Sequence, residues 1–284
     1  MATGNRTWTF SDDVDTFAEA AGPLLAGAPI NHTIALSVIE DARNRAEPLD
    51  PPERYGWWTD GHGVVTGAML HTPGHPSLLE LAPDESIQPL VDVLAPLGVG
   101  GQGVNGPSHL ALTFAAVAMA RLGCRTRLVQ AMRLFRLDVL RPPERRASGA
   151  VRRGHPSDQD LLAEWTEAFA TEAHTTVANA ADAVRRRLAH DGVRLWVEDG
   201  VPVSFAARTR SSAGVSRIGP VYTPSRFRRR GFGAAVTSAV AADILAEGST
   251  PVLFTDAANP TSNALYQRLG FTAVDDRVWL TFEE

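Results

Sequence analysis

Three consecutive arginines followed by two glycines form the stretch with the clearest potential for chemistry. A helix start leaves backbone N–H groups without partners, and glycines let a ligand approach the main chain. Such a turn suits an anionic phosphate, and guanidinium groups add charge-assisted hydrogen bonds. A solvated basic loop is the alternative. The glycine spacing favours the phosphate site. The turn consists of Arg228, Arg229, Arg230, Gly231, Phe232, Gly233 and Ala234.

Extended and helical patterns flank this turn and would position it. An extended run, 218–223, precedes it and ends at Pro224. Behind it, apolar residues recur at helical spacing up to Gly248, which predicts a long helix. A strand is expected at 252–255. A further helix is expected from Asn259, as its N-cap, to Gly270, and the last strand at 278–282.

The segment before the arginine turn predicts the rest of a second domain. Runs at 194–198, 202–209 and 215–223, separated by turns, suggest an antiparallel meander. An earlier strand is expected at 147–153, followed by a helix capped by Ser157 and another near 179–189. The best linker is 141–146, so we expect the domains to be 1–143 and 144–284.

The first 140 residues show a similar alternation of helices and strands. We expect helices from a cap at Ser11, at about 31–45, 84–94 and 107–122. Strands are expected at 55–58, 64–70 and 77–81, and 126–140 reads as extended. The fold class expected for the whole chain is therefore α/β, or α+β, in two domains.

A glycine-rich run at 98–106 contains the dinucleotide pattern G-x-G-x-x-G. No convincing strand precedes it, and Arg125 and Arg127 stand where a ribose-binding acid belongs. We therefore interpret the run as a strand-to-helix connection. His62, His71 and His75 could suggest a metal, but Pro73 and Gly74 separate the last two. They are interpreted as turn histidines, and no metal is expected.

Composition excludes several mechanisms. All 27 basic residues are arginine, so lysine Schiff bases and P-loop lysines are absent. Cys124 is the only cysteine, which excludes intrachain disulfides and cysteine-rich zinc sites. The net charge of −5 gives no general field for nucleic acid. No secretory signal or membrane-spanning run is visible, so we expect a cytoplasmic protein without membrane contact.

The second domain, about residues 147–284, resembles the GNAT family of acyl-CoA-dependent N-acyltransferases. The family pattern R/Q-x-x-G-x-G/A is met by Arg228, Gly231 and Gly233. A later family segment is met by Asn259, Ser262, Tyr266, Gly270 and Phe271. The first domain lacks both motifs and looks like a degenerate GNAT unit. The resemblance therefore implies two tandem GNAT-like domains, each with a mixed, mostly antiparallel sheet flanked by helices.

The resemblance also implies roles for individual residues. The strand end Val221, Tyr222 and Thr223 would pair with the pantetheine arm of coenzyme A, as an added strand does. The N–H groups from Arg229 to Ala234 would hold the pyrophosphate. Asn259 and Ser262 would lie near the pantetheine. Tyr266 would protonate the departing thiolate after an amine attacks the acetyl group. Tyr266 as a packing residue is the alternative, and the base is left open between Asp256 and water.

The function expected is acetyl-CoA-dependent N-acetylation of a small-molecule amine. A GNAT-fold aminoacyl transferase is one alternative, and the acidic net charge speaks against it. A non-catalytic acyl-CoA sensor is another. The first domain would shape the acceptor site or support the second domain. A homodimer stays open.

Overall fold

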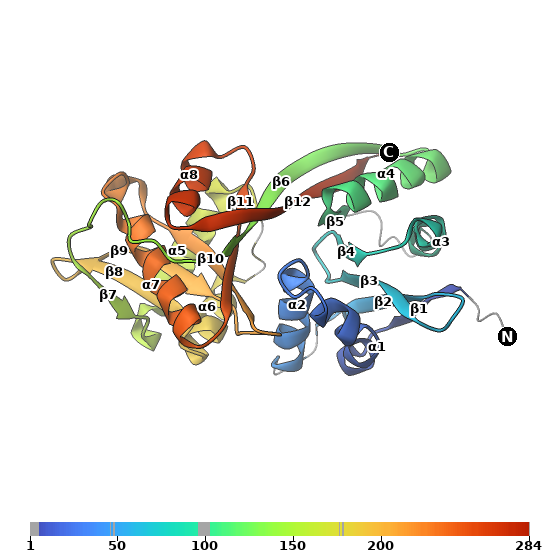
Figure 1. Ribbon diagram of the computed structural model, residues 1–284, viewed down its shortest axis with the longest axis horizontal. Coiled ribbons are helices and arrows are strands. Elements are labelled where there is room, and N and C mark those ends of the chain that lie inside the picture. The colour runs from blue at the N-terminus through green and yellow to red at the C-terminus, as the bar shows by residue number, and fades with distance from the viewer. Residues whose placement is uncertain are drawn as a thin grey trace. The chain divides into compact units, whose positions relative to one another are not determined.

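The computed structural model describes residues 6–45, 47, 49–95, 103–175, 177 and 179–283. The chain divides into two compact units (Figure 1). Unit 1 is Met1–Met132 together with Asp275–Glu284, and unit 2 is Arg133–Val274. Of the glycine-rich run 98–106, residues 98–102 lie outside the described residues.

Unit 1 is a mixed sheet covered by helices on both faces. Its strands pair in the order β1-β2-β3-β4-β5, and residues of β12 (Phe271–Glu283) and β6 (Arg125–Leu137) follow. β4 and β5 are parallel, whereas the other pairs from β1 to β4 are antiparallel. Its elements are β1 (Thr7–Ser11), α1 (Val14–Ala26), α2 (Thr33–Arg43), β2 (Arg54–Thr59), β3 (Val65–His71), β4 (Ser77–Leu81), α3 (Asp84–Leu94), β5 (Val104–Pro107) and α4 (Ser108–Leu122).

Two apolar clusters lie on the two faces of the unit 1 sheet. One joins α1 and α2 to β2, β3 and β4, with Phe17, Leu36 and Leu78 among its members. The other joins α3 and α4 to the opposite face, with Leu79 and Phe114 among its members. Adjacent residues of β4 therefore belong to different clusters, as the alternation of a β-strand requires.

Unit 2 repeats this plan. From β11 the strands follow in the order β11-β10-β9-β8-β7. The meander from β8 to β10 is antiparallel, as the sequence predicted, and β10 and β11 are parallel. Its elements are β7 (Ala150–Arg153), α5 (Gln159–Glu172), α6 (Ala180–Ala189), β8 (Val193–Glu198), β9 (Val201–Arg208), β10 (Val215–Tyr222), α7 (Phe232–Ala246), β11 (Thr250–Asp256) and α8 (Pro260–Arg268).

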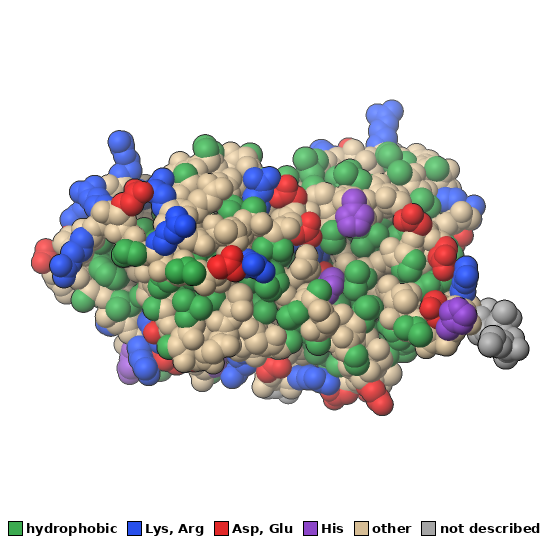
Figure 2. All heavy atoms as spheres, in the orientation of Figure 1, with side chains coloured by type: hydrophobic (Ala, Val, Ile, Leu, Met, Phe, Trp, Pro, Cys, Tyr) green, Lys and Arg blue, Asp and Glu red, His purple; other side chains and the backbone are tan. Residues whose placement is uncertain are grey.

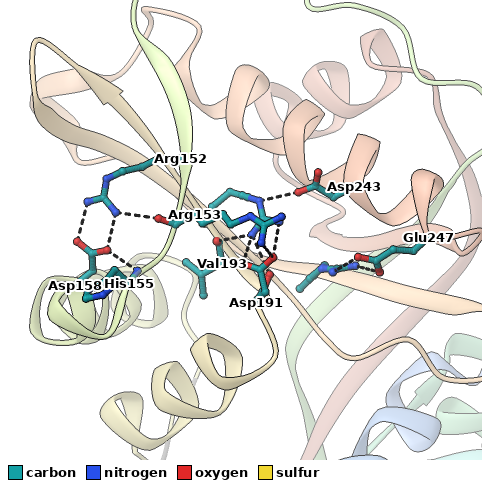
Figure 3. A network of polar contacts seen from close by, with 10 residues as sticks. Arg152, Arg153, His155, Asp158, Asp191, Val193, Asp243 and Glu247 are labelled. Atoms are coloured by element: carbon teal, nitrogen blue, oxygen red, sulfur yellow. Dashed lines mark hydrogen bonds and ion pairs between the residues drawn. The ribbon is translucent and has the colours of Figure 1, made fainter.

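Burial and ion pairs fix α7 on the unit 2 sheet. Val236, Val240 and Ile244 are fully buried on one side of this helix. Two ion pairs lie near its C-terminal end (Figure 3). Asp243 Oδ2 lies 2.7 Å from Nε of Arg194 in β8, and Glu247 Oε2 lies 2.5 Å from Nη1 of Arg208 in β9. Because these contacts hold the helix along its length, they also fix the position of its N-terminus.

Two long strands contribute residues to both units. β6 (Arg125–Leu137) and β12 (Phe271–Glu283) are each 13 residues long. The division falls inside each of them, between Met132 and Arg133 and between Val274 and Asp275. The units therefore differ from the single boundary expected at residue 143. β6 contains no turn residue to mark its crossing, whereas the crossing in β12 falls next to Asp275 and Asp276.

Local signals gave two wrong helix caps and missed two strands. Asp13 rather than Ser11 caps α1, because its Oδ1 accepts the N–H groups of Asp15 and Thr16. A 3₁₀ turn, Pro156–Asp158, precedes α5, so Ser157 does not cap that helix. β1 and β5 were not expected from the sequence, and residues 104–106 of the glycine-rich run belong to β5. Among the described helices, none is long and apolar enough to cross a membrane.

Candidate active site

The parallel pair β10 and β11 stays paired over only half of its length. Paired residues run from Val215 with Thr250 to Ile218 with Leu253. The register of β10 with β9 shifts between Ile218 and Val221, where the Gly219–Pro220 peptide bond is cis. Val221 and Tyr222 still pair with β9. The opposite edge of this strand end is therefore free to pair with an extended ligand.

The chain then turns sharply into α7. A 3₁₀ turn, Ser225–Phe227, is followed by Arg229 at φ 65° and Gly231 at φ 91°. Both lie in the left-handed region, which glycine occupies without steric cost. α7 begins at Phe232, and Gly231 caps it without a side chain. The turn therefore aims consecutive main-chain N–H groups away from the helix.

These N–H groups are without acceptors. Arg228 N–H donates to Ser225, and Ala235 N–H donates to Gly231. Between them, no N–H from Arg229 to Ala234 has an acceptor among the described residues. Unsatisfied donors at a helix N-terminus attract anions, and the helix dipole adds to this attraction. The turn therefore presents free donors where the sequence predicts an anion site, and the binding of an anion there stays a prediction.

The three arginine side chains of the turn differ in what they contact. Arg228 pairs with Glu172 at 2.5 Å, and Arg230 pairs with Glu198 at 2.6 Å. Arg229 has no carboxylate partner within the described ranges. The sequence predicts guanidinium groups of this turn near the phosphates. The structure leaves only the Arg229 guanidinium uncommitted, because carboxylates from α5 and β8 hold the other two.

Side-chain hydrogen bonds tie the turn to the sheet. Arg228 Nε donates to the carbonyl of Thr223 at 2.8 Å. The Ser204 hydroxyl of β9 lies 2.9 Å from the Tyr222 carbonyl and 2.8 Å from the Thr223 hydroxyl. Glu198 also receives the Ser148 hydroxyl; this bond and the Arg230 guanidinium lower the pKa of its carboxyl group. The strand end and the helix start are therefore held as one unit.

Tyr266 lies on α8 against the apolar core of unit 2. Its ring is half-buried and meets Phe271 edge-on, with the ring centroids 5.9 Å apart. Burial raises the pKa of its hydroxyl to about 12. The hydroxyl has no hydrogen-bond partner in the part of the chain that the structure describes. It is therefore protonated at neutral pH and available to a ligand.

The other predicted residues near α8 serve the backbone. Asn259 Oδ1 accepts the N–H of Ser262 at 3.0 Å, which confirms Asn259 as the N-cap of α8. Asp256 Oδ1 accepts the N–H of Ala258 at 2.8 Å, so its carboxylate closes the turn after β11. This contact favours Asp256 as a structural cap over Asp256 as a base.

Three supporting residues were missed at the level of sequence. Glu172 ends α5, and its carboxylate also receives the Tyr222 hydroxyl at 3.2 Å. Ser204 sits inside β9. Arg145 donates to the carbonyl of Arg229 at 3.0 Å. Each lies far from the turn in the sequence, and no local pattern links it to the arginines.

Known structures share the fold of this chain. A GCN5-related N-acetyltransferase from Sphaerobacter thermophilus aligns with 97% of this chain and 95% of its own, at 17% identity and a TM-score of 0.64. A tandem GNAT protein from the clavulanic acid biosynthesis pathway aligns over 97% and 98%, at 15% identity and a TM-score of 0.63. The chain has the tandem GNAT fold. The expected fold class is thereby confirmed.

A family match covers part of this fold. Residues 200–280 match the family described as FR47-like protein. That range includes the arginine turn, α7 and α8. A GCN5-related N-acetyltransferase from Kribbella flavida aligns with 78% of this chain and 88% of its own, at 20% identity and a TM-score of 0.53. A search of curated protein sequences finds no significant match.

Proposed function

We propose that this protein is an acetyl-CoA-dependent N-acetyltransferase that acts on a small-molecule amine. One observation carries the proposal. The unsatisfied N–H groups from Arg229 to Ala234 lie directly after the strand end where β10 loses its partner β11. A phosphate cradle beside a free strand edge suits a ligand with a pyrophosphate and an extended amide-containing arm.

The residues present fit coenzyme A. The N–H groups of the turn would hold the pyrophosphate, and the Arg229 guanidinium adds an unpaired positive charge. The free edge at Val221 and Tyr222 would pair with the pantetheine amides. Because Arg228 already contacts Glu172 and Thr223, its role would be to hold the turn in shape.

Within this mechanism Tyr266 would be the proton donor. Acetyl-CoA supplies an activated acetyl group whose leaving group is a thiolate. A hydroxyl with its pKa raised to about 12 keeps its proton at neutral pH and can give it to that thiolate. The amine must be neutral to attack. Since the Asp256 carboxylate closes a turn, water is the better relay for the proton of the amine.

Titration calorimetry with acetyl-CoA, followed by thiol release across a panel of amines, tests the proposal. We expect binding, and release of free thiol that depends on one class of amine. Binding of acetyl-CoA without amine-dependent release of thiol would indicate an acyl-CoA sensor rather than an enzyme. Absence of binding would remove both functions. Aminoacyl transfer from tRNA has less support, since acidic side chains lie among the basic ones on the face seen in Figure 2.

A further inference from the structure

A group of buried polar side chains lies within unit 1, on the face of the sheet that α1 and α2 cover. Trp279 of β12 is opposite Asn105 of β5, which is opposite Leu78 of β4. Leu78 packs in the cluster of α1 and α2, so Glu80, two residues further, shares its face. Leu280 packs in the opposite cluster, so Trp279 and Arg277 face α1 and α2.

Arg277 and Glu80 form the centre of this group. Their side chains are fully buried, and Arg277 Nη1 lies 3.0 Å from Glu80 Oε2. Nη1 also lies 3.2 Å from the carbonyl of Asn31. His32, next in the chain and also buried, places Nδ1 3.1 Å from the same Glu80 oxygen. Burial works against the charge of Glu80, but Arg277 and His32 outweigh it and lower the pKa of that carboxyl.

More than half of the polar side-chain atoms of this pair have no partner among the described residues. Arg277 Nε and Nη2 have no partner, and neither does Glu80 Oε1. On the same face, Asn105 Oδ1 and Trp279 Nε1 are also buried without partners. Buried polar atoms are almost always hydrogen-bonded, and leaving charged ones unpaired is costly. So many unpaired atoms on one face indicate a missing ligand.

The chemistry of the unpaired atoms describes that ligand. Nε and Nη2 form one edge of a guanidinium, and this edge matches the two oxygens of a carboxylate. Glu80 Oε1 and Asn105 Oδ1 are acceptors, which suit an ammonium group. We propose that unit 1 binds a small zwitterion, an α-amino acid, through the free edge of Arg277 and the free oxygen of Glu80. None of these atoms reaches the surface, so the ligand is small and enclosed.

Calorimetry and thermal unfolding of the full chain, without coenzyme A, test this site. The probes are glycine, acetate and ethylamine, which carry both charges, the carboxylate alone and the ammonium alone. We expect glycine to bind and to raise the unfolding temperature, acetate to bind more weakly, and ethylamine not to bind. If glycine gives neither heat nor a shift, or if acetate binds as tightly as glycine, the zwitterion site is wrong.

Two variants assign the contacts. Arg277→Lys keeps a charge beside Glu80 but loses the planar edge, and should weaken glycine binding about tenfold or more. Glu80→Gln should weaken glycine binding but leave acetate binding unchanged. Arg208→Lys, at a buried arginine of unit 2, is the matched control and should leave glycine affinity unchanged. Unaltered glycine affinity in the first two variants would overturn the assignment. Acetyl-CoA binding is a separate measurement, so this site and the proposed function can fail independently.

Discussion

Arg228 Nη2 lies 2.5 Å from Glu172 Oε2, while Nε of the same side chain donates to the carbonyl of Thr223. The arginine of the family pattern therefore links the end of α5 to the end of β10. Two of its three guanidinium nitrogens are engaged within the protein. This geometry favours a role for Arg228 in positioning the turn over direct contact with a phosphate.

Glu172→Gln tests that role. If Arg228 holds the turn in shape, loss of the carboxylate loosens it, and we expect acetyl-CoA affinity to fall about threefold to tenfold. If Arg228 instead contacts phosphate, freeing it from Glu172 would strengthen binding. Calorimetry distinguishes the two results by their sign. Glu167→Gln, at an exposed residue earlier on the same helix, is the control and should leave acetyl-CoA affinity unchanged.

Gly231→Ala tests the phosphate cradle. At φ 91° an added Cβ is strained, and we expect about 1 kcal/mol of lost stability and about tenfold weaker acetyl-CoA binding. Gly248→Ala is the matched control, because Gly248 has φ 77° with open space around it at the other end of α7. It should lose similar stability and keep its affinity. Equal losses of affinity in both variants would contradict the cradle.

Tyr266→Phe tests the proton donor. We expect kcat to fall about a hundredfold with little change in acetyl-CoA affinity. Stability should hold, because the hydroxyl that is removed has no partner among the described residues. With the pKa raised to about 12, any decline in wild-type rate below about pH 10 must come from another group. Unchanged kcat would leave Tyr266 a packing residue.

Asp158→Asn tests an ion pair at the start of α5. Asp158 accepts two hydrogen bonds from Arg152, at 2.7 and 2.8 Å, and these lower the pKa of its carboxyl below 3.8. A carboxyl group whose pKa is lowered by folding stabilises the folded state at pH values above its ordinary pKa. This stabilisation disappears as the pH falls through the pKa of the folded state. The variant should be about 1 kcal/mol less stable at pH 7, and urea unfolding should show the gap closing below about pH 4. A gap independent of pH would contradict the ion pair.

Gly270→Ala tests the glycine that connects α8 to β12. A Cβ at Gly270 would lie 2.0 Å from the carbonyl oxygen of Val139, and φ is 100°. We expect a loss of at least about 2 kcal/mol in urea unfolding. Gly200→Ala has φ 78° with nothing near its Cβ, and should lose less. Similar losses in the two variants would mean that the close approach of the backbone is unimportant.

Patterns confined to neighbouring residues predicted the elements well. The spacing of Val236, Val240 and Ile244 predicted α7, and all three are buried. Asn259 and Pro260 marked the start of α8 correctly. These signals work because helix periodicity and capping are local. β1, β5 and the full length of β12 were missed because strands are stabilised by partners far away in the sequence.

The site was predictable in its backbone but not in its side-chain contacts. Glycine spacing located the turn, since a left-handed residue before a helix leaves few choices of side chain. The pairing of Arg228 with Glu172 and of Arg230 with Glu198 depends on residues brought near by the fold. Counting arginines therefore overstated the free positive charge, and the structure reduces it to Arg229.

Because β12 contributes residues to both units, unit 1 is completed only late in translation. Unit 1 includes Asp275–Glu284, which the ribosome makes only after all of unit 2. The β5 edge of its sheet, which β12 covers through the pairing of Gly106 with Val278, stays open during that time. Open strand edges promote aggregation. The sheet of unit 1 therefore stays incomplete until β12 has been made.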